Sequence, residues 1–559
     1  MQTLAELILA RGDDDGTALL FEDQRWSWRE YVGACIARAQ LLLELRREGP
    51  FHVGVLLDNV PEFPLLLGAA ALAGAAVVGI NPTRRGAELE RDIGHTEVQL
   101  LVTEERHAPA LDGLRLPVDA GRRYLVESSA WREAVARHAG KAAPRVALDP
   151  RAPYLLIFTS GTTGDPKAAI CSQARLAGVA GVAKDLPSIA LGPSDVTYLA
   201  MPLFHSNAVM VGFATSVAAG AAMALRRRFS ASGFLPDLRR YGCTYMPYVG
   251  KPLSYVLATP ERPDDAENPL RRCFGNEGTP RDLSLFERRF GCKVTDNYGS
   301  TEGGIAISRT PDTPPGALGL GLPGTLILEP ETGRELPRAR FDASGRLCNA
   351  DEAIGEIANT QSAAAFEGYW KNPEADLERT RRGIYWSGDL GYRDEQGFLY
   401  FAGRNYDWLR VDGENFAAAP VEAILCRHPD VLLAAVYAVP SPVVGDDVMA
   451  AVLPREGRAF DAAGLGAFLA AQPDLGSKQA PRYLRVVKDL PVTPTHKILK
   501  RALRAELWVC ADPVWLRAAD GSYRPMAPAD REAIARDFAA RGRTPVLELE
   551  RGRASAPKT

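Results

Sequence analysis

The sequence predicts an α/β protein whose large N-terminal part contains stacked, mostly parallel sheets flanked by helices. Short apolar runs alternate with helical patterns through roughly the first 400 residues, a pattern typical of such sheets. Residues 51–59, 98–105 and 154–161 (FHVGVLLDN, VQLLVTEE and YLLIFTSG) are examples of the apolar runs. The chain also has 559 residues, too many for one compact core, so two or more domains are expected.

Two apolar stretches, residues 63–80 and 208–225, carry no charge over 18 residues each. That length is the lower limit for a membrane-spanning helix. Alanine and glycine dominate both stretches, and such residues insert weakly into a bilayer. We therefore expect each stretch to form a buried helix followed by a buried strand.

Charge and cysteine usage exclude several classes of protein. The 66 basic and 69 acidic side chains give a net charge of −3, which offers no global reason to bind nucleic acid or an acidic membrane. The eight cysteines form no CxxC pair, which is typical of reduced thiols in a cytosolic protein. Residues 1–16 contain an early acid and no long apolar run, so neither a signal peptide nor an anchor is expected. The prediction is a cytoplasmic protein with at most peripheral membrane contact.

A domain boundary is predicted near residue 403. Residues 384–402 read as strands broken by turns, and new helix and strand signals begin at 423–428 and 432–440. We expect an N-terminal domain over residues 1–402, a hinge at 403–408 and a small α+β domain over 409–559. Another segment, residues 310–325, contains a G-x-G-x-x-G string, but it follows prolines and has Pro323 inside it, so we interpret it as a turn.

The strongest chemical signal is Thr159–Lys167 (TSGTTGDPK), directly after the apolar run YLLIF. Hydroxyls and glycines in this density can present N–H and O–H donors to phosphate oxygens, and Lys167 adds a positive charge. Pro166 before the lysine, and the lack of Ser or Thr after it, exclude a Walker A loop. The alternative is an ordinary polar turn at the surface.

Five strings in order along nearly the whole chain resemble the adenylate-forming superfamily of acyl-CoA synthetases, adenylation domains and luciferases. They are TSGTTGDPK, NYGSTE (297–302), YWSGDLG (385–391), GRNYDWLRVDGEN (403–415) and PVTPTHKILKR (491–501). The resemblance implies a small β-barrel-like part in the N-terminal domain and a mobile C-terminal domain. It also implies ATP, Mg²⁺ and CoA as cofactor and co-substrates.

The resemblance implies specific roles for residues within these strings. ATP or AMP would contact Thr159, Ser160, Gly161, Thr162, Thr163, Gly164, Lys167, Gly275, Asn276, Glu277, Asn297, Tyr298, Gly299, Ser300, Thr301, Asp389 and Arg404. Within this set Tyr298 would stack near adenine, Thr301 would meet the α-phosphate, and Asp389 and Arg404 would lie at the ribose. Glu302 and Thr163 would hold Mg²⁺. Catalytic roles fall on Lys497, Glu302, Thr163 and His205, and the loop Gly413, Glu414 and Asn415 would lie on the CoA side.

The chemistry of adenylate formation agrees with these assignments. An anionic carboxylate must attack an anionic α-phosphate while pyrophosphate leaves. Lys167, Lys497 and a metal at Glu302 would offset the charge that accumulates. No protein nucleophile is required, because the substrate carboxylate attacks. The resemblance further implies that the small domain rotates between an adenylation step and a thioester-forming step.

Other stretches are similar to the fatty acid transport protein and very-long-chain acyl-CoA synthetase branch, and most of all to actinobacterial fatty acid–CoA ligases. These are residues 247–257, 272–278 and 512–528. The branch implies a long-chain or very-long-chain fatty acid as substrate. The acyl-binding candidates are Phe204, His205, Tyr248, Val249 and Gly250.

Two positions depart from the superfamily pattern: Tyr406 stands at the hinge pivot and His496 precedes the adenylation lysine. Three alternatives remain open at this stage. The acid could be a sterol side-chain or other lipophilic carboxylate, and the acceptor could be a carrier protein in place of CoA. A non-catalytic lipid-binding protein would be expected to lose Lys167, Glu302 or Lys497, all of which are present.

Overall fold

The computed structural model describes residues 1–159, 167–249, 251–278, 280–343, 347–404, 408–411, 414–443, 445–457, 460–476, 478–492 and 498–547. The chain divides into two compact units. The first unit comprises Met1–Gly278, Asp282–Gly303 and Ala364–Glu378, and the second comprises Thr279–Arg281, Gly304–Ala363 and Arg379–Thr559. The domain bounds and the hinge at 403–408 stay predictions.

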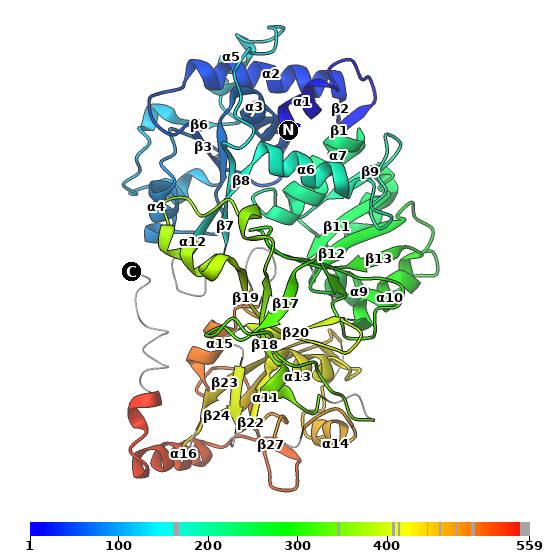
Figure 1. The fold of residues 1–559 in the computed structure, drawn as a ribbon, viewed down its shortest axis with the longest axis vertical. Helices are drawn as coiled ribbons and strands as arrows, with labels where there is room; N and C mark the ends of the chain where they lie inside the picture. Colours follow the sequence, from blue (N-terminus) through cyan, green and yellow to red (C-terminus); the bar gives the residue numbers. More distant parts are fainter. Residues whose placement is uncertain are drawn as a thin grey trace. The chain divides into compact units, whose positions relative to one another are not determined.

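A six-stranded sheet in the first unit carries the predicted phosphate loop. Its order is β6-β5-β3-β4-β7-β8, with β3 to β7 drawn in blue and cyan in Figure 1. Its strands are β6 (Arg123–Leu125), β5 (Leu100–Thr103), β3 (His52–Leu56), β4 (Ala76–Gly79), β7 (Pro153–Thr159) and β8 (Lys167–Ser172). All neighbouring pairs are parallel except β7 and β8. The predicted α/β class is confirmed.

A second, seven-stranded sheet in the first unit has the order β13-β12-β11-β9-β10-β1-β2. Its strands are β13 (Lys293–Asp296), β12 (Arg272–Asn276), β11 (Tyr245–Val249), β9 (Val196–Leu199), β10 (Ala222–Leu225), β1 (Thr17–Phe21) and β2 (Gln24–Ser27). It is parallel apart from the β1–β2 hairpin. The predicted candidate residues 248–249 and 275–277 lie at the carboxyl ends of β11 and β12, where ligands bind in such sheets.

The two uncharged stretches are helices followed by strands, as predicted. Helix α3 (Glu62–Ala73) is buried along nearly its whole length and leads into β4. The second stretch forms a π-helix, η3 (Ala208–Ala214), then α7 (Thr215–Ala219) and β10. No helix in the part of the chain that the structure describes is long and apolar enough to cross a membrane.

Further helices of the first unit pack around these sheets. They are α1 (Leu4–Leu9), α2 (Trp28–Glu44), α4 (Gly86–His95), α5 (Ser129–Ala136), α6 (Gln173–Ala183), α8 (Phe234–Tyr241) and α9 (Lys251–Ala258). Helix α2 begins with a capping box, because Ser27 accepts the Glu30 N–H and the Glu30 carboxylate accepts the Ser27 N–H. Two more helices, α10 (Pro280–Phe290) and α12 (Pro373–Arg379), begin or end at the division between the units.

The second unit is built from antiparallel and mixed sheets. One has the order β17-β18-β19-β20, with β17 (Thr325–Leu328), β18 (Gly355–Asn359), β19 (Tyr385–Arg393) and β20 (Leu399–Arg404). Strands β21 (Trp408–Val411) and β22 (Glu414–Ala417) pair with each other. A five-stranded sheet follows, comprising β23 (Val431–Pro440), β24 (Asp446–Pro454), β25 (Tyr483–Val486), β26 (Val514–Arg517) and β27 (Tyr523–Pro525). Its helices include α13 (Ala418–Leu425), α14 (Leu465–Ala470), α15 (Lys500–Glu506) and α16 (Pro528–Ala540).

The G-x-G-x-x-G string, predicted as a turn, is a short strand followed by a turn at residues 323–324. Its central residues form the short strand β16 (Leu320–Gly321), which pairs with β15 (Ala306–Ser308). Gly319 and Gly324 have φ values of +131° and +82°, which favour glycine. Strand β17, not a helix, follows directly, so this segment lacks the helix N-terminus on which a dinucleotide phosphate would bind.

Candidate active site

The predicted phosphate loop joins two antiparallel strands. Thr159 ends β7 and Lys167 begins β8, and the two residues are directly opposite each other in the ladder. The Thr159 hydroxyl donates to the Lys167 carbonyl over 3.4 Å. Five predicted ATP contacts lie between them and outside the described residues: Ser160, Gly161, Thr162, Thr163 and Gly164. The two ends of the predicted loop, Thr159 and Lys167, are therefore fixed by main-chain pairing.

Lys167 is a buried lysine whose ammonium contacts a charged and an aromatic side chain; the charged partner, Glu378, is 63% exposed. Lys167 is 8% exposed, and its Nζ lies 3.1 Å from Glu378 Oε2. The same Nζ lies 5.6 Å from the ring centroid of Tyr369. The hydroxyl of Tyr369 in turn donates to Glu302 Oε1 over 2.8 Å. Tyr369 thus connects the predicted phosphate lysine to the predicted metal carboxylate.

The backbone at Thr301 is held from two sides. Arg175 Nη2 donates to the Thr301 carbonyl over 2.5 Å. The Thr301 and Ser206 hydroxyls lie 2.8 Å apart. Tyr298 and Gly299 form the short strand β14 just before, and the Ser300 hydroxyl accepts the Gly303 N–H over 3.2 Å. The predicted α-phosphate contact is therefore fixed beside Glu302.

The predicted adenine segment lies at the carboxyl end of β12, where it pairs with β11. Tyr248 is opposite Gly275, and a Cβ on Gly275 would lie 2.1 Å from the Tyr248 carbonyl oxygen, so only glycine fits there. The Asn297 N–H donates to the Gly275 carbonyl over 2.8 Å. Asn276 Oδ1 is buried and has no hydrogen-bond partner among the described residues, so it is an acceptor that fits a donor on a bound ligand. The next residue, Glu277, has a φ of +65°.

The acyl-binding candidates lie around the π-helix. Phe204 and His205 are half-buried in the loop after β9, and Asn207 Nδ2 donates to the Tyr248 carbonyl over 3.2 Å. Tyr248 and Val249 are buried, and the Tyr248 hydroxyl donates to Asp296 over 2.8 Å. π-helices are rare and are frequent at functional sites. Gly250 lies outside the described residues.

The remaining candidates belong to the second unit. Asp389 on β19 is opposite Arg404, the last residue of β20, and its N–H donates to the Ser387 hydroxyl over 3.0 Å. Glu414 and Asn415 begin β22. Gly413, Lys497, Tyr406 and His496 lie outside the described residues. The second unit therefore pairs the two predicted ribose residues by main-chain register.

Sequence reasoning missed four side chains that contact the predicted site: Arg175, Ser206, Tyr369 and Glu378. Tyr369 and Glu378 come from the string FEGYWKNPEADLE (366–378), to which no role was assigned. This string is rich in aromatic and acidic residues but has neither strand nor helix periodicity. Such a composition does not reveal which residues the string contacts in the fold.

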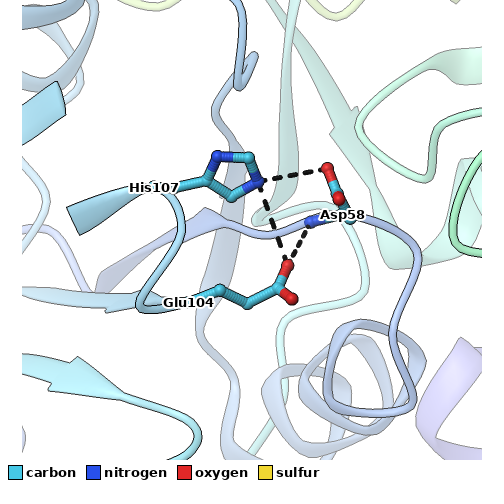
Figure 2. Close-up of side chains that lie close together, drawn as sticks. All are labelled: Asp58, Glu104 and His107. Atoms are coloured by element: carbon cyan, nitrogen blue, oxygen red, sulfur yellow. Dashed lines mark hydrogen bonds and ion pairs between the residues drawn. The ribbon is translucent and has the colours of Figure 1, made fainter. Parts of the chain in front are cut away.

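A second group of potential metal ligands lies at the carboxyl ends of β3 and β5. Asp58, Glu104 and His107 have ligand atoms within 4.8 Å of one another (Figure 2). His107 Nε2 lies 3.1 Å from Asp58 Oδ1, and the Asp58 N–H donates to Glu104 Oε2 over 2.7 Å. All three residues are buried.

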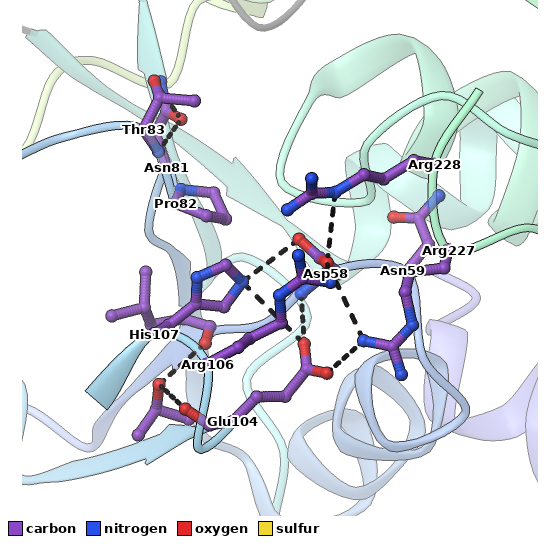
Figure 3. A network of polar contacts seen from close by, with 12 residues as sticks. Asp58, Asn59, Asn81, Pro82, Thr83, Glu104, Arg106, His107, Arg227 and Arg228 are labelled. Carbon is purple, nitrogen blue, oxygen red and sulfur yellow. Dashed lines mark hydrogen bonds and ion pairs between the residues drawn. The ribbon is translucent and has the colours of Figure 1, made fainter. Parts of the chain in front are cut away.

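Three arginines surround these carboxylates (Figure 3). Arg106 and Arg228 lie 2.7 and 3.3 Å from Asp58 Oδ2, and Arg227 pairs with Glu104 Oε1. Burial acts to raise the pKa of Asp58, yet the His107 hydrogen bond and the Arg228 and Arg106 charges outweigh it and hold that pKa below its usual range. The carboxylates are thus already engaged by cations, and we interpret these six residues as a structural charge cluster, not a metal centre.

Replacing Glu104 with glutamine should lower the stability of the first unit by about 2 kcal/mol, because the charge cluster loses a buried anion while Arg227 keeps its charge. The value is below that for fully buried pairs because Arg227 is 37% exposed. Calorimetric unfolding of the variant measures the loss. Glu105→Gln changes an exposed neighbour and is the matched control. Equal unfolding temperatures for the two variants would contradict this interpretation. A large loss of wild-type stability when divalent metals are chelated would contradict it as well.

Comparison with known proteins gives matches along nearly the whole chain. The AMP-binding enzyme family matches residues 9–370, and the AMP-binding enzyme C-terminal domain matches residues 420–497. The chain is 48% identical to steroid-22-oyl-CoA synthetase from Rhodococcus jostii over 551 residues, 98% of this chain and 99% of that protein. It is 51% identical to the medium/long-chain-fatty-acid–CoA ligase FadD17 from Mycobacterium tuberculosis over 516 residues, 92% of this chain and 98% of that protein.

Solved structures with the same fold include ATP-bound MatB from Rhodopseudomonas palustris, with a TM-score of 0.77 and 24% identity over 90% of this chain and 98% of that chain. An anthranilate CoA ligase in complex with anthranoyl-AMP gives a TM-score of 0.78 and 21% identity over 90% of this chain and 97% of that chain. At these identities the likeness concerns the fold.

Proposed function

Because the chain belongs to the AMP-binding enzyme family, we propose that it is an ATP-dependent acid–CoA ligase that forms an acyl-adenylate from a lipophilic carboxylic acid. The observation that carries the proposal is the contact chain from Lys167 through Tyr369 to Glu302. It brings together a carboxylate and the lysine that ends the predicted phosphate string Thr159–Lys167. A lysine suits phosphate oxygens and a carboxylate suits Mg²⁺, so the pair fits a metal-bound triphosphate.

The side chains of the site suggest separate roles in the first step, the formation of the acyl-adenylate. Lys167 and Lys497 would neutralise charge on the phosphates as the acid carboxylate attacks. Thr301, fixed by Arg175 and Ser206, would orient the α-phosphate. Asp389 and Arg404 would hold the ribose hydroxyls. The protein then acts by positioning and charge stabilisation, and the acid itself supplies the nucleophile.

Glu302 is the described residue that would hold Mg²⁺, with Thr163 as the second ligand. Glu302 is 6% exposed, and its carboxylate offers the oxygen donors that Mg²⁺ prefers. The carboxylate accepts from the hydroxyl of Tyr369, whose ring faces Lys167. When bound, Mg²⁺ would neutralise and orient the phosphate oxygens.

A fatty acid of medium to very long chain is the substrate we favour, in agreement with the FadD17 relative. A steroid side-chain carboxylate is the second candidate, because the relative that spans 98% of this chain is a steroid-22-oyl-CoA synthetase. Both are amphiphilic acids with a large apolar body. Tyr248 and Val249 are packed beside the π-helix, and we propose that the apolar body of the acid binds in this region.

CoA is the acceptor we propose, because the relatives that cover nearly the whole chain are CoA ligases. The loop Gly413, Glu414 and Asn415 would then face the CoA thiol in the second step, after rotation about the hinge. A carrier-protein acceptor is the alternative. We further propose a cytoplasmic location with at most peripheral contact with membranes.

AMP release from ATP, measured with purified protein and a panel of acids, tests the proposal. The panel runs from acetate through long-chain fatty acids to steroid side-chain acids, each with and without CoA. Turnover that requires both a lipophilic acid and CoA is expected. AMP release that does not depend on CoA would point to a carrier protein as the acyl acceptor. Turnover with acetate alone would contradict a lipophilic substrate.

A further inference from the structure

Residues 364–378 are held against β8, the strand that Lys167 begins. They belong to the first unit although the residues on both sides of them belong to the second. The Ile170 N–H donates to the Gly368 carbonyl over 2.9 Å and the Trp370 N–H to the Ala168 carbonyl over 2.8 Å. Ala169 and Tyr369 form an antiparallel bridge. The backbone of Tyr369 is therefore fixed relative to the strand that carries the phosphate lysine.

The Tyr369 side chain is equally constrained. It is 2% exposed, and its ring contacts Phe366 edge-on at 5.1 Å between centroids. Its own N–H donates to Asp376 Oδ1 over 2.7 Å, and it packs with Ala169 and Ala375. A side chain packed in this way has one rotamer, so its hydroxyl has one direction.

We propose that Tyr369 is a positioning residue of the nucleotide site, acting on Glu302 and Lys167 at once. The hydroxyl donates to Glu302 Oε1 over 2.8 Å and fixes the plane of that carboxylate. The ring face lies 5.6 Å from Lys167 Nζ and attracts the cation. The rigid ring therefore sets the separation between the carboxylate and the ammonium. This inference rests on the proposed function, in which those two groups bind metal and phosphate.

The identity of the acceptor, Glu302, distinguishes Tyr369 from the other buried tyrosines of the first unit, since Tyr198 and Tyr248 donate to Asp237 and Asp296. A buried tyrosine needs an acceptor, and a main-chain carbonyl serves elsewhere in the first unit: Tyr154 donates to the Leu67 carbonyl over 2.8 Å. Tyr369 instead donates to the carboxylate predicted to hold Mg²⁺. Hydrogen bonds to a charged acceptor are roughly twice as strong as neutral ones, so the hydroxyl restrains Glu302 effectively.

The substitution Tyr369→Phe removes the hydroxyl and keeps the ring. Its matched control is Tyr154→Phe, which removes a buried hydroxyl from the same unit without affecting Glu302. We would measure ATP dissociation constants by calorimetry, in excess Mg²⁺ and in EDTA, for both variants and the wild type. The ratio of the two constants reports the metal's contribution to binding.

Tyr369→Phe should reduce the Mg²⁺-dependent gain in ATP affinity roughly ten-fold, as expected for loss of a hydrogen bond to a charged group. Affinity in EDTA should change little, and Tyr154→Phe should keep the wild-type ratio even if it unfolds at a lower temperature. An unchanged ratio in Tyr369→Phe, with normal wild-type binding, would overturn this inference alone. A wild-type protein that binds no ATP in either condition would overturn the proposed function and this inference together.

Discussion

Replacing Lys497 with alanine is expected to reduce adenylate formation from acid and ATP by a hundred-fold to a thousand-fold, about the loss seen when one transition-state donor is removed. The reason is electrostatic: a carboxylate and a phosphate of like charge approach each other, and a lysine at that point offsets the repulsion. The rate of acid-dependent AMP or adenylate production under single-turnover conditions measures the effect.

The second half-reaction provides the internal control for Lys497. Acyl-adenylate supplied directly should react with CoA at nearly the wild-type rate, since that step forms a thioester without a triphosphate. Lys488→Ala, which changes an exposed lysine of the same unit, should leave both steps unchanged. Equal loss in both half-reactions of Lys497→Ala would reject the role assigned to this lysine.

Replacing Glu302 with glutamine should raise the Mg²⁺ concentration needed for half-maximal adenylation at least ten-fold and lower the maximal rate. The variant keeps the shape of the side chain and an oxygen that can accept from the Tyr369 hydroxyl, so the fold around it is retained. The Glu302→Gln variant loses the negative charge, and Mg²⁺ prefers charged oxygen ligands. Initial rates over a Mg²⁺ titration at fixed ATP measure the effect.

Glu287→Gln is the matched control for Glu302, because Glu287 is an acid of the same unit, in α10, that also accepts a hydrogen bond, from the Val294 N–H in β13 over 2.8 Å. It should leave the Mg²⁺ titration unchanged. A Glu302→Gln variant with the wild-type requirement for Mg²⁺ and the wild-type rate would move the metal site elsewhere.

The fold class could be predicted because its signals are local. The apolar runs at 51–59, 98–105 and 154–161 became β3, β5 and β7, and the uncharged stretch at 63–80 became a buried helix and strand. Each follows from residue types within a short window. The family was also predictable, because its motifs are short strings, and the matches over residues 9–370 and 420–497 confirm it.

The neighbours of the site could not be predicted in the same way. Tyr369 contacts Glu302, 67 residues away in the sequence, and Glu378 contacts Lys167, 211 residues away. Within the charge cluster, Arg227 likewise contacts Asp58 and Glu104, which come from distant segments of the chain. No periodicity or turn signal encodes such pairs, since the topology of the sheets brings them together. The roles assigned to Lys497 and the hinge stay predictions.

Acid-dependent exchange of labelled pyrophosphate into ATP, measured without CoA, tests most directly whether the protein forms an acyl-adenylate. The exchange requires that the first step be reversible and that pyrophosphate leave before any acceptor is added. We predict exchange that depends on Mg²⁺ and on a lipophilic acid, that stops in Lys497→Ala, and that continues in Lys488→Ala. CoA thioester formation accompanied by ADP release, with no pyrophosphate exchange under any condition, would contradict an adenylate intermediate.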